Sequence, residues 1–571
     1  MIVHVFACDY DGTIAADGRV AAATAEALAR VRASGRKLLL VTGRMLNDLR
    51  SVCPDTDKMF DAVVAENGAV LYFPETRETK VLGDAPEPAL LDALRRRRVP
   101  FDVGASIIAT DERSAEAALA AIRETGVERT LVFNKGALML LPGGVTKATG
   151  LEAALTAMEL SAHNTVCIGD AENDHIFLAI SECGVAVANA VPALKERADE
   201  ITRAPNGKGV IEFIDERLVN DCQDLIPRLT RHRLRIGETA DGEPVALPAH
   251  GTRLLIVGPS GSGKTTLTGA LVERIVESGR TALLVDPEGD YQTLADLEGV
   301  VVLGGTGERA LPTPEELQQL LRRPRSTLVL NLSAMSRVEK VAYATKVLGV
   351  VAAARSTSGV PHWLIVDEAH HVLPAEGSPA AELLGAGPES LCMITLSIGD
   401  LAPEARTLPT AVASTELGAF AAALEALRDG GAPAAIPGGA LDRGEAALAW
   451  FDDPPRAVRF RVARRRVQHR RHVRKYTEGE LPPDRSFFFR GPTAALNLRA
   501  VNLTRFVELA EGVDEPTWAY HLERGDYSAW LRDMIKDPEL AAQIAALETA
   551  GDKPAASRRR VLDAIRARYA V

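Results

Sequence analysis

"LLIVGPSGSGKTTLTGAL", residues Leu254–Leu271, combines an apolar run, a glycine-rich loop and the start of a helical pattern. Such a strand–loop–helix unit is typical of α/β sheets that bind phosphate at a helix N-terminus. The pattern G-x-x-x-x-G-K-T spans residues 258–265, where Lys264 should reach the outer phosphates and Thr265 should ligate Mg²⁺. We therefore predict an ATP site formed by Gly258, Ser260, Gly261, Ser262, Gly263, Lys264, Thr265 and Thr266.

A later apolar run, "PHWLIVDEAHHVLP", ends in two acidic residues, Asp367 and Glu368. We expect Asp367 to hold the Mg²⁺ shell and Glu368 to polarise water against the γ-phosphate. An acid at this place favours ATP hydrolysis over transfer of phosphate to another hydroxyl. The adjacent His370 and His371 are predicted to begin a helix rather than to bind metal.

The beginning of the chain carries a different pattern, "FACDYDGTIAADG", residues Phe6–Gly18. Asp9 and Asp11 follow an apolar strand and can converge on one point where the chain bends into a loop. One carboxylate can then attack phosphorus while the other handles the proton of the leaving group. A divalent cation would offset the negative charge.

Three further segments support a phosphoryl-transfer site. "LLLVTGR" places Thr42 at a strand end, "GGVTKATGLEAAL" places Lys147 before a helix, and "VCIGDAENDHIFL" places Asp170 and Asp174 after a strand. A hydroxyl and an ammonium can bind the transferring phosphoryl group, and the acids can complete an oxygen-rich Mg²⁺ site. The predicted catalytic residues are Asp9, Asp11, Thr42 and Lys147, and the predicted metal ligands are Asp9, Asp11, Asp170 and Asp174.

With "DYDGT", "VTGR", "ENGA" and "GDAENDH" in this order, residues 1–215 resemble the haloacid dehalogenase (HAD) superfamily, class IIB, Cof-type phosphatases. The resemblance implies that Asp9 is a phosphoaspartyl nucleophile and Asp11 the general acid/base. Thr42 and Lys147 would hold phosphate, and Asp170 with Asp174 would bind Mg²⁺. Arg44 and Asn173 would assist. It also implies a small α/β cap at about residues 82–142.

Residues 231–475 resemble HerA/FtsK-type P-loop ATPases. The resemblance rests on an entry hairpin that turns at Asp241–Gly242, the P-loop, "TALLVDPEGDY" and "VDEAHHVLP". It implies a RecA-like domain in a homo-oligomer whose neighbouring subunit supplies an arginine. Thr395 or Ser397 would act as the polar sensor. The basic run Arg456–Tyr476 favours either nucleic-acid contact or a strand with one charged face.

The bulk composition is that of a multidomain globular protein. The chain has 571 residues, a net charge of −11 and six cysteines without a CxxC pair, so we expect buried thiols in a reducing cytoplasm. The N-terminus reads as a strand rather than a signal peptide, and no apolar run is long enough for a membrane span. The predicted fold class is α/β: a HAD Rossmann-like domain with its cap, a RecA-like ATPase domain, and a mainly helical region at 476–571 of unknown role.

The favoured function is an Mg²⁺-dependent HAD phosphatase fused to an ATP-hydrolysing domain, oligomeric and acting on a phosphorylated small molecule or nucleotide. Two alternatives stay open. One is a phosphatase–kinase fusion that acts on nucleic-acid ends or nucleotides. The other is an ATP-driven oligomeric interaction platform in defence or repair.

Overall fold

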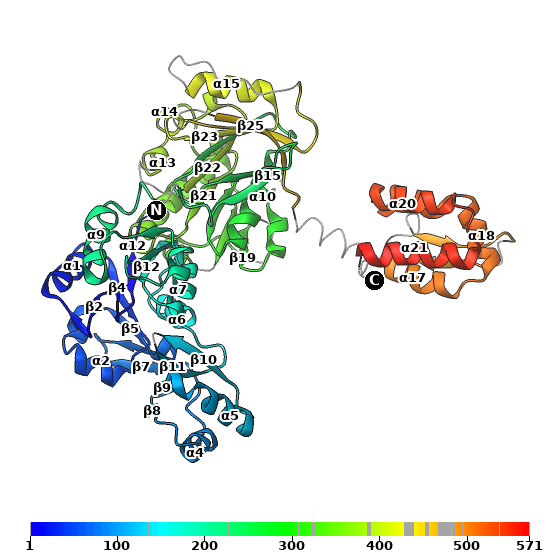
Figure 1. Cartoon of the computed structure of the whole chain (residues 1–571). Helices are drawn as coiled ribbons and strands as arrows, with labels where there is room; N and C mark the ends of the chain where they lie inside the picture. Colours follow the sequence, from blue (N-terminus) through cyan, green and yellow to red (C-terminus); the bar gives the residue numbers. More distant parts are fainter. Residues whose placement is uncertain are drawn as a thin grey trace. The chain divides into compact units, whose positions relative to one another are not determined.

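The computed structural model (Figure 1) divides into two compact units, Met1–Arg464 and Arg465–Val571. It describes residues 2–134, 136–225, 228–305, 309–322, 326–384, 390–427, 439–451, 456–465, 481, 486–493, 496–535 and 537–569. The first unit contains two sheet-based parts, called here the N-terminal part (residues 1–215) and the central part (residues 231–464). The end of the basic run, residues 466–476, and the expected boundary at 475/476 lie outside the described residues.

The N-terminal part is built on an eight-stranded sheet in the order β14-β13-β12-β1-β4-β5-β6-β7, parallel from β14 to β5. Its strands are β1 (Val5–Cys8), β4 (Lys37–Val41), β5 (Ala62–Ala65), β6 (Val70–Phe73), β7 (Glu78–Val81), β12 (Thr165–Gly169), β13 (Cys183–Ala186) and β14 (Glu200–Ile201). The central strands are apolar throughout because helices cover both faces of a parallel sheet. Since β1 lies between β12 and β4, the residues that follow these three strands emerge at one edge of the sheet.

Four helices of this part matter for the site and its surroundings: α1 (Ala22–Ala33), α6 (Lys147–Ala157), α7 (His175–Ile180) and α9 (Asn206–Glu216). The expected cap is a separate antiparallel sheet, in the order β10-β11-β9-β8, with two helices and its own small apolar core. Its elements are α4 (Pro88–Arg96), β8 (Asp102–Val103), β9 (Ile108–Asp111), α5 (Ala115–Thr125), β10 (Arg129–Asn134) and β11 (Ala137–Pro142).

The central part holds an eleven-stranded sheet in the order β16-β15-β25-β24-β23-β17-β22-β21-β18-β20-β19. Its parallel strands are β17 (Arg253–Val257), β18 (Ala282–Asp286), β19 (Val300–Gly304), β20 (Thr327–Asn331), β21 (Trp363–Val366), β22 (Ser390–Thr395) and β23 (Ala411–Ser414). The apolar face of α10 (Lys264–Glu277) packs on one side of this sheet. α11 (Pro314–Leu321), α12 (Arg337–Ser358) and α15 (Leu417–Leu427) pack on the other.

Four antiparallel strands extend this sheet: β15 (Leu234–Glu238), β16 (Pro244–Leu247), β24 (Glu445–Trp450) and β25 (Arg456–Val462). β15 and β16 form the hairpin that the Asp241–Gly242 turn predicts, and Gly242 has a φ of 83°. The first part of the basic run is a strand, β25, in which Arg459 pairs with Glu445 and Arg456 lies over the ring of Trp450.

The second unit is mainly helical, as the sequence predicts. It consists of the short strands β26 (Phe487–Phe489) and β27 (Leu498–Ala500) with α17 (Leu503–Gly512), α18 (Glu515–Glu523), α19 (Asp526–Trp530), α20 (Pro538–Glu548) and α21 (Pro554–Tyr569). Its aromatic side chains pack into one buried core, with Trp518 stacked on Tyr527 at 4.3 Å. Packing thus accounts for the aromatic spacing of this region.

All six cysteines are free and buried, in agreement with the expectation of unpaired thiols. Within the described residues, no helix combines the length and the apolar composition that crossing a bilayer requires.

Candidate active sites

A buried group of charges lies at the carboxyl edge of the N-terminal sheet. Asp9 follows β1 and Asp170 follows β12, which are neighbouring parallel strands. The Lys147 ammonium lies 2.5 Å from Asp9 Oδ1 and 2.5 Å from Asp174 Oδ1. Residues far apart in the sequence therefore form one site, which we call the acidic cluster: Asp9, Lys147, Asp170 and Asp174.

Local structure fixes three members of the acidic cluster, Lys147, Asp170 and Asp174. Thr146 caps α6 through a capping box with Thr149, which places Lys147 in the first turn of the helix. Asp174 Oδ2 accepts the backbone N–H groups of Asp170 and Ala171, each at 2.8 Å. The hydroxyl of Thr13 donates to Asp170 Oδ1 at 2.9 Å. Rotation of these carboxylates is thereby restricted.

The electrostatics of the acidic cluster suit a divalent cation. Burial raises the pKa of Asp9, and the negative charges of Asp174 and Asp170 add to this effect against the opposing charge of Lys147. Carboxylate oxygens of Asp9, Asp170 and Asp174 lie within 4.8 Å of one another, and all three residues are buried. Three buried carboxylates against one ammonium leave excess negative charge, and oxygen is the ligand that Mg²⁺ prefers. The residues present therefore fit Mg²⁺.

Asp11 stays outside the acidic cluster. Its two carboxylate oxygens accept hydrogen bonds from Arg44 Nε at 2.6 Å and Nη2 at 2.8 Å, and Arg44 Nη1 also binds Asp48 at 2.6 Å. Thr42 is buried and its hydroxyl accepts the N–H of Arg44 at 3.2 Å. The structure thus places Asp11 beside the cluster but does not bring it among the candidate metal ligands.

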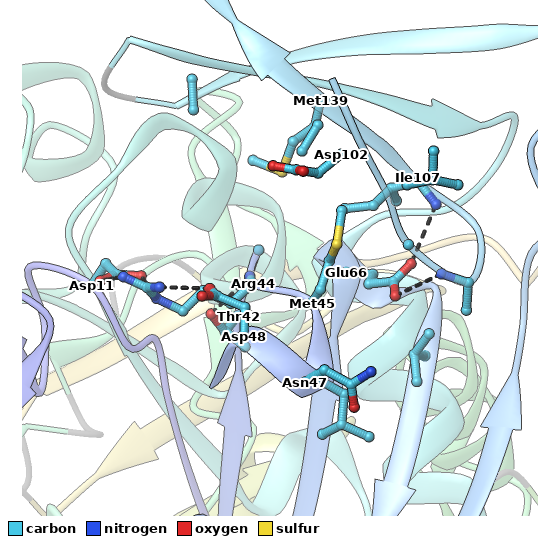
Figure 2. A pocket seen from close by; sticks show the side chains of 18 of the residues that line it. Asp11, Thr42, Arg44, Met45, Asn47, Asp48, Glu66, Asp102, Ile107 and Met139 are labelled. Atoms are coloured by element: carbon cyan, nitrogen blue, oxygen red, sulfur yellow. Dashed lines mark hydrogen bonds and ion pairs between the residues drawn. The ribbon is translucent and has the colours of Figure 1, made fainter. Parts of the chain in front are cut away.

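A cavity of about 910 Å³ opens over Asp9 and is roofed by the cap (Figure 2). The N-terminal sheet contributes Asp9, Asp11, Thr42 and Arg44, and the cap contributes Asp102 and Met139 among other residues. A cavity of this size matches ligand pockets for small molecules. Of the acidic cluster, Asp9 lines this cavity.

Glu66, in the "ENGA" segment, joins the sheet to the cap. Its carboxylate accepts backbone N–H groups of Ala105 at 2.9 Å, Ser106 at 3.0 Å and Ile107 at 3.2 Å, and Figure 2 shows the bond to Ile107. The residue is 3% exposed and has a φ of 53°. A side chain on Gly104 would lie 2.6 Å from this carboxylate. Sequence reasoning missed this role, because the partners of Glu66 are backbone groups that carry no sequence signal.

The P-loop has the geometry that its motif predicts. Gly258, Gly261 and Gly263 have φ angles of 151°, 76° and 111°, and α10 begins at Lys264. The Lys264 ammonium donates to the carbonyls of Gly258 at 2.9 Å and Pro259 at 3.1 Å. These are contacts that the lysine can exchange for phosphate oxygens.

Acidic residues lie at the carboxyl ends of β21 and β18, close to the P-loop in the strand order. Burial, followed by the charge of Glu368, raises the pKa of Asp367 to about 7. Glu368 has a left-handed backbone with a φ of 38°, a conformation that a non-glycine residue adopts at an energetic cost. Asp286 accepts three backbone N–H groups of the "DPEGDY" loop. Asp367 and Asp286, at the ends of these two strands, are carboxylates of the kind that could ligate the Mg²⁺ of bound ATP.

His370 and His371 end a single 3₁₀ turn, Ala369–His371, and do not begin the helix that the sequence predicts. His370 Nδ1 lies 3.3 Å from the Thr395 hydroxyl. Thr395 ends β22. Of the two candidate sensors, Thr395 is thus the one in contact with the segment that follows Asp367 and Glu368.

Comparison with known proteins gives two family matches. Residues 6–86 and 91–214 match a haloacid dehalogenase-like hydrolase family, and residues 234–351 match the central domain of helicase HerA. A phosphoglycolate phosphatase of Methanothermobacter thermautotrophicus is 34% identical over 224 residues, which are 37% of this chain and 97% of that protein. Phosphoglycolate phosphatase 2 of Saccharolobus solfataricus is 28% identical over 219 residues, 37% of this chain and 91% of that protein.

A solved haloacid dehalogenase-like hydrolase from Bacteroides thetaiotaomicron is similar at 20% identity with a TM-score of 0.33, covering 37% of this chain and 98% of its own. The sequence matches cover nearly the full length of the phosphatases and coincide with the part that holds the acidic cluster. The chain belongs to the haloacid dehalogenase-like hydrolases through its N-terminal part, and its central part carries a HerA-type domain.

Proposed function

We propose that the N-terminal part is an Mg²⁺-dependent phosphomonoesterase that works through a phosphoaspartyl intermediate on Asp9. The observation that carries the proposal is the position of Lys147, held 2.5 Å from both Asp9 and Asp174 beneath the cap cavity. An ammonium beside the nucleophile can stabilise the negative charge of the transferring phosphoryl group. Asp9, Asp170 and Asp174 would hold Mg²⁺, which supplies charge neutralisation when bound.

In the proposed reaction, Asp9 Oδ attacks phosphorus, and the bond between phosphorus and the ester oxygen breaks. Asp11 gives its proton to the leaving alkoxide. Water then attacks the phosphoaspartate and gives a proton to Asp11, and inorganic phosphate leaves. Because Asp11 is bound by Arg44, this ion pair must open before Asp11 can carry a proton.

We propose a phosphorylated small molecule as the substrate. The cavity of about 910 Å³ is roofed by the cap, which favours a small ligand over a nucleic-acid end. Phosphoglycolate is the first candidate, because several relatives of the N-terminal part are phosphoglycolate phosphatases.

The test is phosphatase turnover of the full chain on p-nitrophenyl phosphate and phosphoglycolate with Mg²⁺. We expect Asp9→Asn to lower kcat on the order of 10³-fold or more, because it removes the nucleophile. Asp17→Asn, an exposed aspartate in the following loop, is the matched control and should keep wild-type turnover. Wild-type turnover in Asp9→Asn would refute the assignment of the nucleophile.

We further propose that the central part binds and hydrolyses ATP at the P-loop, with Thr265 and Asp367 around Mg²⁺ and Glu368 activating water. The acidic side chain directly after Asp367 supports hydrolysis rather than a kinase reaction. Transfer of labelled phosphate from ATP to a 5′-hydroxyl DNA end would favour the kinase alternative instead.

A further inference from the structure

The N-terminal and central parts meet through buried polar side chains, which we call the joint. The Arg280 guanidinium of the central part is hydrogen-bonded to the Glu182 carboxylate of the N-terminal part, and both residues are 2% exposed or less. The remaining members of the joint are His163, His232, His250 and His362. His362 accepts the N–H of Thr281 on Nδ1 at 2.9 Å, so its Nε2–H can donate to the Ser161 hydroxyl, 3.1 Å away across the boundary.

A metal ion is a poor occupant of the joint. Ligand atoms of His163, Glu182 and His232 lie within 4.8 Å of one another, a spacing that a metal could use. However, Arg280 already places its positive charge on the Glu182 carboxylate. A divalent cation at the same oxygen would face the guanidinium at close range. The cluster is therefore better described as a buried ion pair surrounded by histidines.

The ion pair joins two helices whose other ends lie in the two active sites. Arg280 comes three residues after α10, which begins at Lys264 of the P-loop. Glu182 comes two residues after α7, which begins directly after Asp174 of the acidic cluster. A helix of fourteen residues spans roughly 20 Å as one rigid element. The Arg280–Glu182 pair thus links the segments that directly follow the two helices.

Some buried polar atoms of the joint also lack a hydrogen-bond partner. Among the described residues, no acceptor binds Nε or Nη1 of Arg280, although both atoms are buried. His250 Nε2 lies 3.4 Å from the Glu182 carboxylate, beyond a good hydrogen bond, and is likewise buried without a partner there. A buried ion pair with unsatisfied donors contributes little net stability. Separating the partners would nevertheless leave two buried charges uncompensated, which is costly, so a shift of either helix favours movement of Arg280 and Glu182 together.

We propose that the Arg280–Glu182 pair couples the nucleotide state of the P-loop to the phosphatase site. The inference rests on the proposed function of both sites. Lys264 must leave the carbonyls of Gly258 and Pro259 to reach a phosphate, which changes the contacts at the start of α10. A displacement of α10 then moves Arg280, which follows its other end. Through the ion pair with Glu182, the displacement also moves α7 and Asp174. For binding affinities the coupling is reciprocal: the factor by which nucleotide changes the affinity of a phosphatase-site ligand is also the factor by which that ligand changes nucleotide affinity.

The test uses the full chain and p-nitrophenyl phosphate, with and without a non-hydrolysable ATP analogue. We expect the analogue to change phosphatase kcat/KM of the wild type by about fivefold or more. The double variant Arg280→Met/Glu182→Gln leaves no unpaired buried charge. In this variant the analogue should change phosphatase kcat/KM by less than about twofold. If the double variant does not fold, Arg280→Lys, which loses the guanidinium fork, should still halve the effect.

The matched control is Arg322→Met/Glu159→Gln. This exposed pair also links the two parts, at 3.9 Å, and should leave the nucleotide effect unchanged. A second readout, independent of catalysis, is hydrogen exchange of residues 175–183, which should change when the analogue binds the wild type. An active phosphatase with neither a kinetic nor an exchange response would overturn the coupling, as would a full response in the double variant. An inactive wild type would contradict the proposed phosphatase, and the exchange readout would still decide the coupling.

Discussion

At the scale of single residues, the acidic cluster depends on a buried lysine whose neighbours compensate for its burial. Lys147 is 2% exposed, and desolvation alone would lower its pKa, yet the charges of Asp174 and Asp9 outweigh that effect and raise it. The lysine therefore keeps its charge inside the protein, where it can act on a phosphoryl group. Removing one partner of such a buried pair typically costs about 3–5 kcal/mol, so catalytic and structural roles overlap here.

The two predicted ATPase residues can be separated by substitution. Lys264→Ala removes the cation that should bind the outer phosphates, so we expect loss of both ATP binding and ATP hydrolysis. Glu368→Gln keeps the size of the side chain but cannot accept a proton from water, so binding should persist while turnover falls by about 10²-fold or more. Equilibrium binding of a fluorescent ATP analogue and phosphate release measure the two effects. Normal hydrolysis by Glu368→Gln would point to a different catalytic acid.

At the scale of elements, the cap is attached to the sheet by hydrogen bonds between a side chain of the sheet and backbone groups of the cap. Glu66 follows β5, while the N–H groups that it binds lie between β8 and β9. The left-handed backbone at Glu66 and Asn67, with a φ of 53° at both residues, is retained although it is unfavourable. Glu66 thus binds the cap loop that lines the cavity, together with Gly83 and Arg129, which hold Ser106.

We therefore expect Glu66→Ala to loosen the cap. Three N–H groups would lose their acceptor, and those of Ser106 and Ile107 are buried, at a cost of roughly 1–3 kcal/mol for each buried group left unsatisfied. KM for phosphatase substrates should rise by about tenfold, and amide exchange of residues 105–107 should accelerate. Glu78→Gln, exposed on β7, serves as the control with unchanged exchange. Wild-type exchange at residues 105–107 in Glu66→Ala would show that other contacts hold the cap.

At the scale of the whole molecule, the first unit holds two candidate active sites whose supporting elements meet at the joint. Burial, more than any other cause, lowers the pKa of both His232 and His250 to about 4. The charged and titratable groups near them include Glu182, Arg231, Arg280, His163, His362 and the N-terminal amine. These histidines are thus neutral in the folded chain well below the pH at which an exposed histidine takes up a proton.

The sign of the resulting pH dependence follows from these shifts. The unfolded chain binds a proton at each histidine near pH 6.5, before the folded chain does so near pH 4, so stability falls as pH falls through this window. We expect the Tm of the full chain to be lower at pH 5 than at pH 7.5. The loss should be smaller in His250→Gln, because the variant has one such histidine fewer. An equal loss in variant and wild type would exclude His250 as a contributor.

We also propose that ATP drives assembly of several chains. ATPases of the resembled group place the nucleotide at a subunit boundary, where an arginine of the neighbour can reach the γ-phosphate. In β25, Arg459 pairs with Glu445 and Arg456 lies over the ring of Trp450. To reach a neighbour's nucleotide, either arginine would first have to leave this contact within its own chain. We expect light scattering to show a multiple of the monomer mass when a non-hydrolysable ATP analogue is added. A monomeric mass at micromolar protein, together with full ATPase activity, would contradict assembly.

The sequence by itself determined what depends on local pattern. Apolar runs of strand length separated by helical periodicity indicated two α/β parts, and glycines at fixed spacing indicated the P-loop, because these features depend on neighbours along the chain. Motif order also placed Asp9, Lys147, Asp170 and Asp174 at the ends of strands or the starts of helices, and strand order then brought them together.

Tertiary structure alone decided the contacts between segments distant in sequence. Arg44 holds Asp11 outside the acidic cluster, Glu66 binds backbone groups of the cap, and Arg280 meets Glu182 across the joint. None of these pairs has a characteristic spacing, since the partner is a backbone N–H group or lies tens of residues away. Hydrogen bonds and charges act over a few ångströms of space, and only the packing of the sheets and the cap sets which groups come within that range.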